Sequence, residues 1–349
     1  MKGKEILDVI EKTAPGTPIR TGLSNIIDAG IGALIIVGYD DEVEKVIDGG
    51  FFINCEYSPE RLFELAKMDG AIIIDDDCKK ILYANVHIQT DRKYKTTESG
   101  TRHRTAERAA KQLNRIVIAV SERKNALNVY RGDKKYRLRN SAELNVATAQ
   151  SIKILESYRS VLDKELANLS MLELDDLVTF FDVATILQRF EMISRIKEEI
   201  KFYLTEYGVD GRLMNLQVSE LLFGLEEEYS DFVKDYVNVG MDVEDVNNNL
   251  SILNDEELLE IENLCSAIGY PKSYSTLDNK ITSKGYRMLG KISKLTKKDI
   301  EKIVSTYNSI AELQETSDEE LLAIKMSKFK IKALRSGLKR LKVAFELEK

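Results

Sequence analysis

The sequence predicts a multidomain protein of α and β structure, with an N-terminal α/β domain built on a mixed sheet, a central all-α domain and a C-terminal helical segment. Its 349 residues suit two or three domains of about 100–200 residues each. Short apolar runs typical of strands alternate with helical patterns up to Asn140. After Asn140, apolar residues recur only at helical spacing. Residues 281–349 then carry 16 Lys and Arg against 9 Asp and Glu, although the whole chain has a net charge of −7.

Continuous apolar runs predict the buried strands of the first domain at residues 33–38, 70–74 and 116–120. Shorter runs predict further strands at residues 81–84, 126–130 and 135–139. Ser58 before Pro59 predicts the start of a helix, because serine caps helices and proline suits the first helical position. A second helix is predicted from apolar residues at helical spacing, Ala106, Ala109, Ala110 and Leu113.

Helical spacing without strand signals predicts two long helices in the middle third, at residues 143–169 and 182–204. Shorter helical pieces are predicted at residues 175–181, 218–223 and 254–267. A polar stretch at 273–276, behind Pro271, indicates a linker. We therefore predict an α/β domain at 1–142, a helical linker domain at 143–280 and a third domain at 281–349.

Composition excludes several classes of protein. Apolar residues make up 43% and charged residues 31% of the chain, which is ordinary for a soluble globular protein and excludes intrinsic disorder and collagen. The three cysteines form no CxxC pair, and with two histidines this excludes a zinc ribbon and a histidine-rich metal site. No apolar run approaches the roughly 18–20 residues of a membrane span and no signal-peptide core follows Met1, so we expect a cytoplasmic protein without membrane contact.

The net charge hides an asymmetry within the chain. Residues 281–349 carry a net charge of about +7 and residues 1–280 about −14. Such a division suggests that an anion-binding module is attached to another domain. A solvated helix face is the alternative explanation.

Asp69 and Gly70 stand at the entry to the predicted strand 70–74. A carboxylate followed by glycine leaves room for a ligand to approach the backbone closely. The alternative is an ordinary turn that ends a helix, since Asp and Gly are both common in turns.

A second cluster runs from Gly100 to Thr105, directly before the predicted helix of alanines. It gathers two arginines, a histidine and two threonines where a helix leaves its first N–H groups unpaired. Such a set of donors predicts an anion site suited to a phosphate chain. Neither a Walker GxxxxGK[ST] nor a GxGxxG is present, which excludes the common P-loop and Rossmann sites.

Together, Asp69-Gly70-Ala71 and Arg102-His103-Arg104 resemble the paired signature of the diadenylate cyclase domain. The flanks agree, from Gly100 to Arg108 and from Ser121 to Lys124, and the resemblance continues through residues 177–211. It covers nearly the whole chain and points to the DisA family, which joins a cyclase domain, a helical linker and a helix-hairpin-helix domain. The resemblance implies condensation of two ATP into cyclic di-AMP with release of two pyrophosphates. It also implies a homo-octamer in which cyclase domains meet face to face.

The resemblance assigns roles residue by residue. Asp69 would bind a divalent metal, Mg²⁺ or Mn²⁺, and help to activate the 3′-hydroxyl, while Gly70 would let the nucleotide lie against the backbone. The triphosphate would be held by Thr101, Arg102, His103 and Thr105. Arg102 and His103 would also act in catalysis with Asp69. Further ATP contacts are expected from Ile88 beside adenine, from Ser121 and Arg123 at the phosphates, and from Arg104, which is the more structural arginine.

The C-terminal segment resembles a helix-hairpin-helix with an unusual turn. No acidic residue occurs between Leu321 and Phe345. The expected Gly-hydrophobic-Gly turn is replaced by residues 326–328 without glycine, so the backbone contact to a DNA phosphate is weakened. Lysines and an arginine could compensate by charge. The predicted DNA contacts, to branched or junction structures, are Lys325, Lys328, Lys330, Lys332 and Arg335. A degenerate hairpin that serves only in assembly is the alternative.

A function of another class stays open beside the cyclase. The chain could be a DNA-binding architectural protein whose nucleotide site senses ATP without turnover. Such a protein would bind ATP and branched DNA and release no pyrophosphate. Both motifs are intact, which favours the enzyme.

Overall fold

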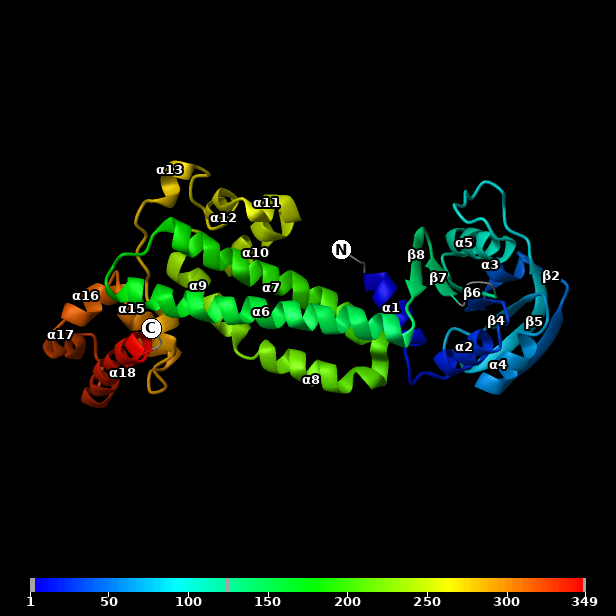
Figure 1. Cartoon of the computed structure of the whole chain (residues 1–349), viewed down its shortest axis with the longest axis horizontal. Coiled ribbons are helices and arrows are strands. Elements are labelled where there is room, and N and C mark those ends of the chain that lie inside the picture. The colour runs from blue at the N-terminus through cyan, green and yellow to red at the C-terminus, as the bar shows by residue number, and fades with distance from the viewer. Residues whose placement is uncertain (1–3, 123–125, 348–349) are drawn as a thin grey trace. The chain divides into compact units, whose positions relative to one another are not determined.

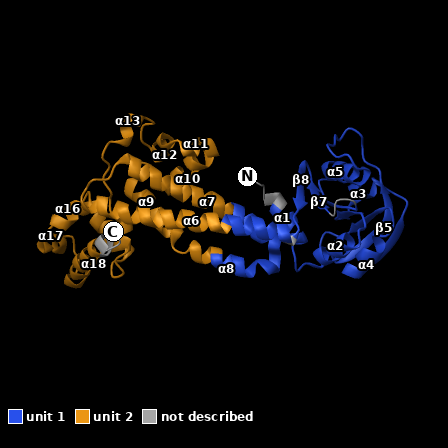
Figure 2. Cartoon of the chain, in the orientation of Figure 1, with its two compact units in different colours: residues 1–151, 199–217 blue, residues 152–198, 218–349 orange. Residues whose placement is uncertain are grey.

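The computed structural model describes residues 4–122 and 126–347 (Figure 1). The chain divides into two compact units, residues 1–151 with 199–217 and residues 152–198 with 218–349 (Figure 2). The division runs through two long helices, α6 (Ser141–Leu174) and α7 (Phe180–Tyr207). Because the boundary between the compact units falls inside these helices, it does not test the predicted domain boundaries at 142/143 and 280/281, which stay predictions.

The first unit is built on one mixed sheet of eight strands, in the order β2-β5-β4-β1-β6-β7-β8, with β3 paired to β5. β1 and β4 are parallel, and the other pairings among the described strands are antiparallel. The bounds are β1 Ala33–Val37, β2 Ile47–Asp48, β3 Phe51–Glu56, β4 Ala71–Ile74, β5 Lys80–Ile88, β6 Ile116–Ser121, β7 Ala126–Arg131 and β8 Lys134–Leu138. The predicted α/β domain with a mixed sheet is confirmed, while β2 and β3 were not predicted.

Helices cover both faces of this sheet, which explains its continuous apolar strands (Figure 1). One core holds Ile35 of β1 with residues of α1 (Lys4–Thr13), α2 (Pro18–Asp28) and α4 (Pro59–Leu65). The other holds Leu34 and Ile36 with the alanines of α5 (Thr101–Leu113), and Val43 of the short α3 (Asp41–Glu44) packs there as well. Small side chains on α5 let that helix lie close to the strands.

The chain is helical after the sheet. Beyond the two long helices it forms η1 Gly208–Gly211, α8 Arg212–Leu221, α9 Leu225–Tyr236, α10 Val243–Ile252, α11 Asp255–Leu259, α12 Ile261–Ala267 and α13 Tyr274–Leu277. The helix predicted at 254–267 is therefore two helices, because Glu260 is extended and ends α11. The helical piece predicted at 175–181 is largely a turn, in which Asp176 has φ +55°. The predicted linker at 273–276 carries α13.

The C-terminal segment forms α14 Tyr286–Gly290, α15 Lys297–Thr306, α16 Ile310–Glu315, α17 Asp318–Ala323 and α18 Lys328–Leu347. Its core includes Met288, Leu289, Leu321 and Leu334, which are fully buried, and Leu174 of α6 packs with them. The turn between α17 and α18 takes residues 324–327, slightly earlier than predicted. Lys325 adopts φ +63° there, the region that glycine would favour.

A membrane crossing finds no support in this fold. Among residues 4–122 and 126–347, no helix combines the length and the apolar character that spanning a bilayer requires.

Candidate active site

Strand register brings the sequence-predicted residues to one edge of the sheet. β1 and β4 run parallel with Ile35 opposite Ile72, so the residues that precede the two strands share an edge. Asp69 and Gly70 precede β4 at this edge. β6 runs the other way with Val120 opposite Ala33, which brings Ser121 to the same edge.

The neighbouring elements close this edge from both sides. Val86 of β5 pairs with Ala71, so Ile88 lies two residues further along toward the same edge. The guanidinium of Arg102 lies against Gly32, the residue before β1, since a Cβ built on that glycine would fall 1.9 Å from Arg102 Nη1. The start of α5 therefore lies at the same edge as Asp69.

The Arg-His-Arg cluster forms the first turn of α5, not a loop before it. Gly100 is the N-cap and the helix begins at Thr101. The sequence prediction placed the start later because the first turn contains no apolar residue. The N–H of Arg104 donates to Gly100 O at 2.9 Å and closes the first turn of α5, so the positive end of the helix dipole lies at this cluster.

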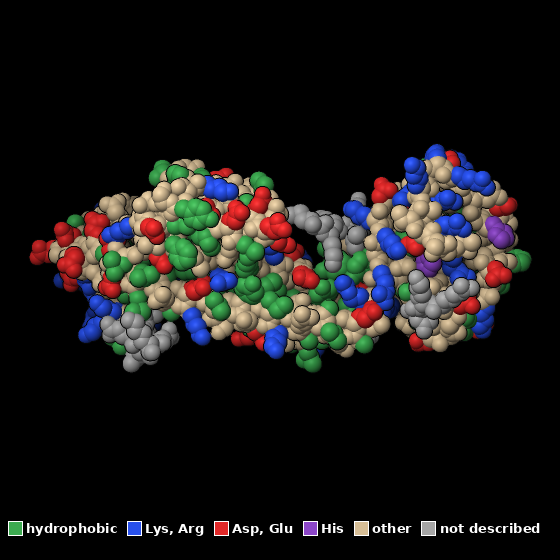
Figure 3. All heavy atoms as spheres, turned by 45° about the horizontal axis from the view of Figure 1, so that its top comes forward, with side chains coloured by type: hydrophobic (Ala, Val, Ile, Leu, Met, Phe, Trp, Pro, Cys, Tyr) green, Lys and Arg blue, Asp and Glu red, His purple; other side chains and the backbone are tan. Residues whose placement is uncertain are grey.

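The predicted site residues differ in their exposure to solvent. Asp69, Thr101 and Arg104 are exposed, and the half-buried members are Gly70, Ile88, Arg102, His103, Thr105 and Ser121. Arg123 lies outside the described residues. Lys and Arg side chains gather over this unit on the face shown in Figure 3. The edge thus offers a solvent-accessible carboxylate beside a cationic helix start.

Gly70 is required by packing, which differs from the reason the sequence suggested. A Cβ on it would fall 2.3 Å from the backbone carbon of Asn85 on β5. Its N–H donates to Asn85 Oδ1 at 3.1 Å, and Asn85 itself has φ +56° beside an irregularity in the β4–β5 pairing. Asn85 is a site residue that sequence reasoning missed. It fixes the backbone that carries Asp69.

His103 belongs to a polar network with three residues that the sequence did not single out. Its Nδ1 lies 3.1 Å from the hydroxyl of Tyr130 and 3.3 Å from Asn128 Nδ2. Tyr130 donates to Glu98 Oε1 at 2.9 Å, and Lys135 pairs with the same carboxylate. Because Glu98 takes the tyrosine hydrogen, the Tyr130 oxygen is available to His103 Nδ1 as an acceptor, whereas the Asn128 amide nitrogen is available to it as a donor, so either tautomer of the ring finds a partner here.

The electrostatics support donation from the Tyr130 hydroxyl to the Glu98 carboxylate. Burial, and then the hydrogen bond to Glu98, raise the pKa of Tyr130 well above its ordinary value. Burial alone would raise the pKa of Glu98, but hydrogen bonds from Lys135 and Tyr130 outweigh it and lower that pKa. Glu98 is therefore ionised and Tyr130 protonated near neutral pH.

Glu107 holds the polar stretch before α5 in place. This buried carboxylate accepts from Thr96 Oγ1 at 2.5 Å, from the Thr97 N–H at 3.0 Å and from Lys111 Nζ at 2.9 Å. The pKa of Glu107 is lowered because these bonds outweigh burial. A carboxylate among the alanines of a predicted buried helix face was a signal that could have identified it.

The described residues fit a divalent cation that takes most of its ligands from a nucleotide. They contain no group of three or more His, Cys, Asp or Glu side chains able to hold a metal ion. Asp69 offers one exposed carboxylate at the edge. Mg²⁺ commonly binds through one or two carboxylates together with phosphate oxygens and water, so a single aspartate is adequate.

The opposite edge of the sheet has a polar cavity of about 340 Å³, which contains none of the predicted site residues. Arg115 spans it and pairs with Asp40, at 2.6 Å, and with Asp76. The pKa of Asp40 is lowered by its hydrogen bond from Arg115. Arg115 is thus held by two carboxylates, and Lys12 and Arg131 also line the cavity.

The predicted DNA contacts fall into two groups. Lys330 Nζ lies 2.6 and 2.7 Å from the carboxylate oxygens of Asp299, whose pKa falls to about 2 because these contacts outweigh burial. Arg335 binds Asp318 at 3.2 Å and the carbonyl of Leu313 at 3.2 Å. Both side chains are engaged inside the segment, whereas the side chains exposed to solvent are Lys325, Lys328 and Lys332.

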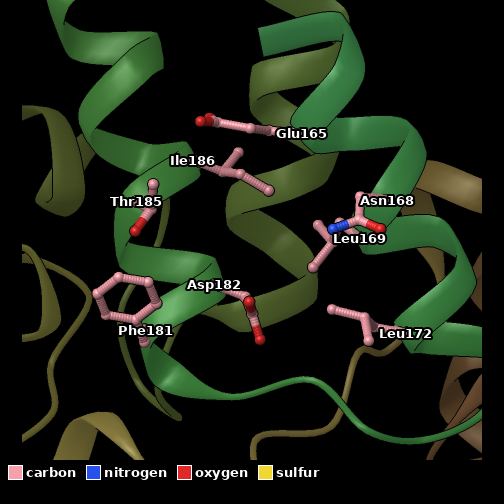
Figure 4. Close-up of a pocket in the computed structure, with 8 residues that line it drawn as sticks. All are labelled: Glu165, Asn168, Leu169, Leu172, Phe181, Asp182, Thr185 and Ile186. Carbon is pink, nitrogen blue, oxygen red and sulfur yellow. The ribbon is translucent and has the colours of Figure 1, made fainter. Parts of the chain in front are cut away.

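A small pocket of about 80 Å³ lies between α6 and α7 in the second unit, apart from this site (Figure 4). Two of its buried oxygens, Thr185 Oγ1 and Glu165 Oε2, have no hydrogen-bond partner among the described residues. Asp182, in contrast, accepts from the hydroxyl and the N–H of Thr179 at 2.7 and 2.9 Å. An unpaired buried hydroxyl lowers stability.

We expect Thr185→Val to raise the free energy of unfolding by about 1 kcal/mol, because valine keeps the shape and removes the unpaired hydroxyl. Thr179→Val is the matched control and should destabilise by about 0.5–2 kcal/mol, because it removes the cap of α7. Urea unfolding followed by circular dichroism measures both. A loss of stability in Thr185→Val would contradict the prediction.

Known proteins resemble this sequence along the whole chain. A family model described as DisA bacterial checkpoint controller nucleotide-binding matches residues 20–135, and one described as DisA bacterial checkpoint controller linker region matches residues 138–277. A protein of Fusobacterium nucleatum named DNA integrity scanning protein DisA is 61% identical over 349 residues, covering 100% of both chains. The protein of that name from Clostridium botulinum (strain Langeland) is 43% identical over 349 residues, covering 100% of this chain and 99% of its own.

A solved structure matches part of the chain. DacA from Staphylococcus aureus, in the form of a double cysteine mutant, is 23% identical, with a TM-score of 0.32. The likeness covers 42% of this chain and 97% of that one.

Proposed function

This chain belongs to the DisA family of diadenylate cyclases, and from that premise we propose that it condenses two ATP into cyclic di-AMP across a pair of facing cyclase domains and that branched DNA bound by its C-terminal segment modulates the rate. The observation that carries the proposal is the meeting of Asp69 and the Arg102–His103 helix start at one sheet edge. One domain presents this pair of motifs once and so binds one ATP.

Two-fold symmetry supplies the second ATP. The product is a symmetric ring, so a symmetric pair of domains aligns both 3′-hydroxyls with both α-phosphates at once. The homo-octamer implied by the family would present such pairs. Light scattering of the purified chain measures the assembly.

The residues at the edge divide the chemistry among them. Arg102, His103 and the threonines of the first turn hold the triphosphate and offset charge that builds on the leaving pyrophosphate. Ser121 and Ile88 contact the phosphates and adenine, with Arg123 and Arg104 as further contacts. Asp69 would hold Mg²⁺ or Mn²⁺, which would supply Lewis-acid chemistry at the phosphates.

Product analysis tests the whole proposal. The full chain is incubated with ATP and Mg²⁺ or Mn²⁺, with and without a four-way DNA junction, and cyclic di-AMP and pyrophosphate are measured. Product formation supports the cyclase. ATP binding with no pyrophosphate release would establish the ATP-sensing alternative instead.

Tyr130→Phe tests the proposed orientation of His103. Without the tyrosine oxygen, His103 Nδ1 loses the 3.1 Å contact that orients its ring, and we expect turnover to fall by about tenfold with KM for ATP changed by less than about twofold. The pH–rate profile should shift as well, because the imidazole loses its hydrogen-bonded link through Tyr130 to the Glu98 carboxylate. Tyr39→Phe is the matched control, since it removes a hydroxyl that bonds Tyr83 at 3.1 Å. An unchanged rate and profile in Tyr130→Phe would refute the role.

DNA modulation is tested by charge removal and not by deletion. Deleting residues 281–349 would remove Arg287, which pairs with buried Glu173 on α6. The double variant Lys328→Gln/Lys332→Gln should lose the response of the cyclase to junction DNA. The control Lys153→Gln/Lys164→Gln, at exposed sites on α6, should keep it. An equal response in both would refute control through this segment.

A further inference from the structure

Phe329 is an exposed aromatic side chain at the start of α18. It is 63% exposed, while Ile331, Leu334 and Leu338 on the same helix are buried in the core of the segment. The ring therefore contributes little to folding. Single exposed apolar side chains are common on protein surfaces, so what distinguishes Phe329 is the set of charges around it.

Cations surround this ring. Lys294 Nζ lies 4.9 Å from the ring centroid, at cation–π distance. Lys328 precedes Phe329, and Lys332 follows at i+3 and so shares its side of the helix. Further along this side the exposed residues are Ser336 and Arg340. Because no acidic residue occurs between Leu321 and Phe345, the surface suits a polyanion.

We propose that Phe329 is a platform on which an unpaired base of branched DNA stacks, while Lys294, Lys328 and Lys332 contact the flanking phosphates. The inference rests on the proposed DNA function of this segment and adds that the surface recognises an unpaired base. A paired duplex buries the faces of its bases, whereas an unpaired base at a branch point can present its face to a protein side chain. Every base has an aromatic face, so stacking selects the branch without reading sequence.

The geometry of the α17–α18 turn implies that stacking on Phe329, and not a backbone contact, distinguishes branched from paired DNA. The α17–α18 turn lacks the glycines that allow close backbone approach to a phosphate, and Lys325 takes the left-handed conformation there. Lysines alone attract any nucleic acid. Preference for branched over paired DNA then needs a second kind of contact, and the exposed ring supplies it.

The test compares two DNA probes on the full chain. One is a duplex with a bulge of unpaired adenines that carries 2-aminopurine in the bulge, and the other is the same duplex fully paired. Phe329→Ala should weaken binding to the bulged probe by about 5- to 150-fold and to the paired probe by less than about twofold. Phe329→Tyr should retain the affinity. Wild-type protein should quench the 2-aminopurine fluorescence.

Phe223→Ala is the matched control, because Phe223 is 81% exposed and precedes the acidic residues 226–228. It should leave both affinities unchanged. Equal losses on both probes, no loss on the bulged probe, or a changed assembly mass by light scattering in Phe329→Ala would each overturn the stacking role. If wild type binds neither probe, the DNA function itself fails. If wild type binds and Phe329→Ala binds equally well, this inference alone fails.

Discussion

Asp69→Asn should reduce cyclic di-AMP formation by at least about a thousandfold, which corresponds to about 4 kcal/mol of lost transition-state stabilisation. Asparagine keeps the size of the side chain and removes its charge. A neutral amide binds Mg²⁺ or Mn²⁺ far more weakly than a carboxylate does, so the 3′-hydroxyl is no longer activated. The rate is measured by product chromatography under saturating ATP.

Stability distinguishes a chemical effect of Asp69→Asn from a structural one. The Asp69 side chain is exposed, so the variant should melt within about 1 °C of wild type. Asp77→Asn is the matched control, since Asp77 lies in the turn after the other end of β4 and is also exposed. It should make product at the wild-type rate. A wild-type rate in Asp69→Asn would remove Asp69 from the mechanism.

The buried part of the cyclase fold could be predicted because burial leaves a pattern in the sequence. β1 is apolar at every position since helices cover both of its sides, and this produces the run that predicts it. β3 carries no such pattern. Phe51 and Phe52 are both exposed, and Asn54 has φ +46° beside an irregularity in the pairing with β5, so the alternation of a strand is interrupted.

The candidate site could be predicted only where a short motif carries it. Asp69 and Arg102 stand in motifs, and strand register then brings them to one edge. Tyr130 and Glu98 are separated by 32 residues, and their hydrogen bond depends on how α5 and the preceding stretch lie over β7. No local pattern encodes such a contact. The same holds for Asp235, which caps α14 from a helix about fifty residues earlier.

A buried charge cluster joins the C-terminal segment to the helical linker within the second unit. Arg287 of α14 is 2% exposed and donates to Glu173 Oε2 at 2.6 Å and to Ser170 Oγ at 2.9 Å. Asp235 accepts from the N–H of Arg287 at 3.0 Å. Tyr236 donates to Glu173. One guanidinium thus compensates two carboxylates, and burial, then repulsion by Glu173, raise the pKa of Asp235 to about 7.

Arg287→Met should therefore lower the free energy of unfolding by about 3–5 kcal/mol and the melting temperature by about 10 °C or more. It leaves Glu173 and Asp235 buried without their cation. Because the pKa of folded Asp235 lies above its unfolded value, the stability linked to this group is complete below pH 4 and is lost as pH rises through about 7. We therefore expect a larger loss at pH 8 than at pH 6, measured by circular dichroism melting at both.

The matched control for Arg287→Met is Lys234→Met, which removes the cation of an exposed pair with Asp231 and should cost less than about 1 kcal/mol. A loss of the same small size in Arg287→Met would contradict the argument. The double variant Arg287→Met/Glu173→Met should recover part of the stability, because a buried carboxylate without its cation costs more than an apolar side chain of similar volume. Recovery at pH 8 but little at pH 6 would identify excess negative charge, and not lost packing, as the cause.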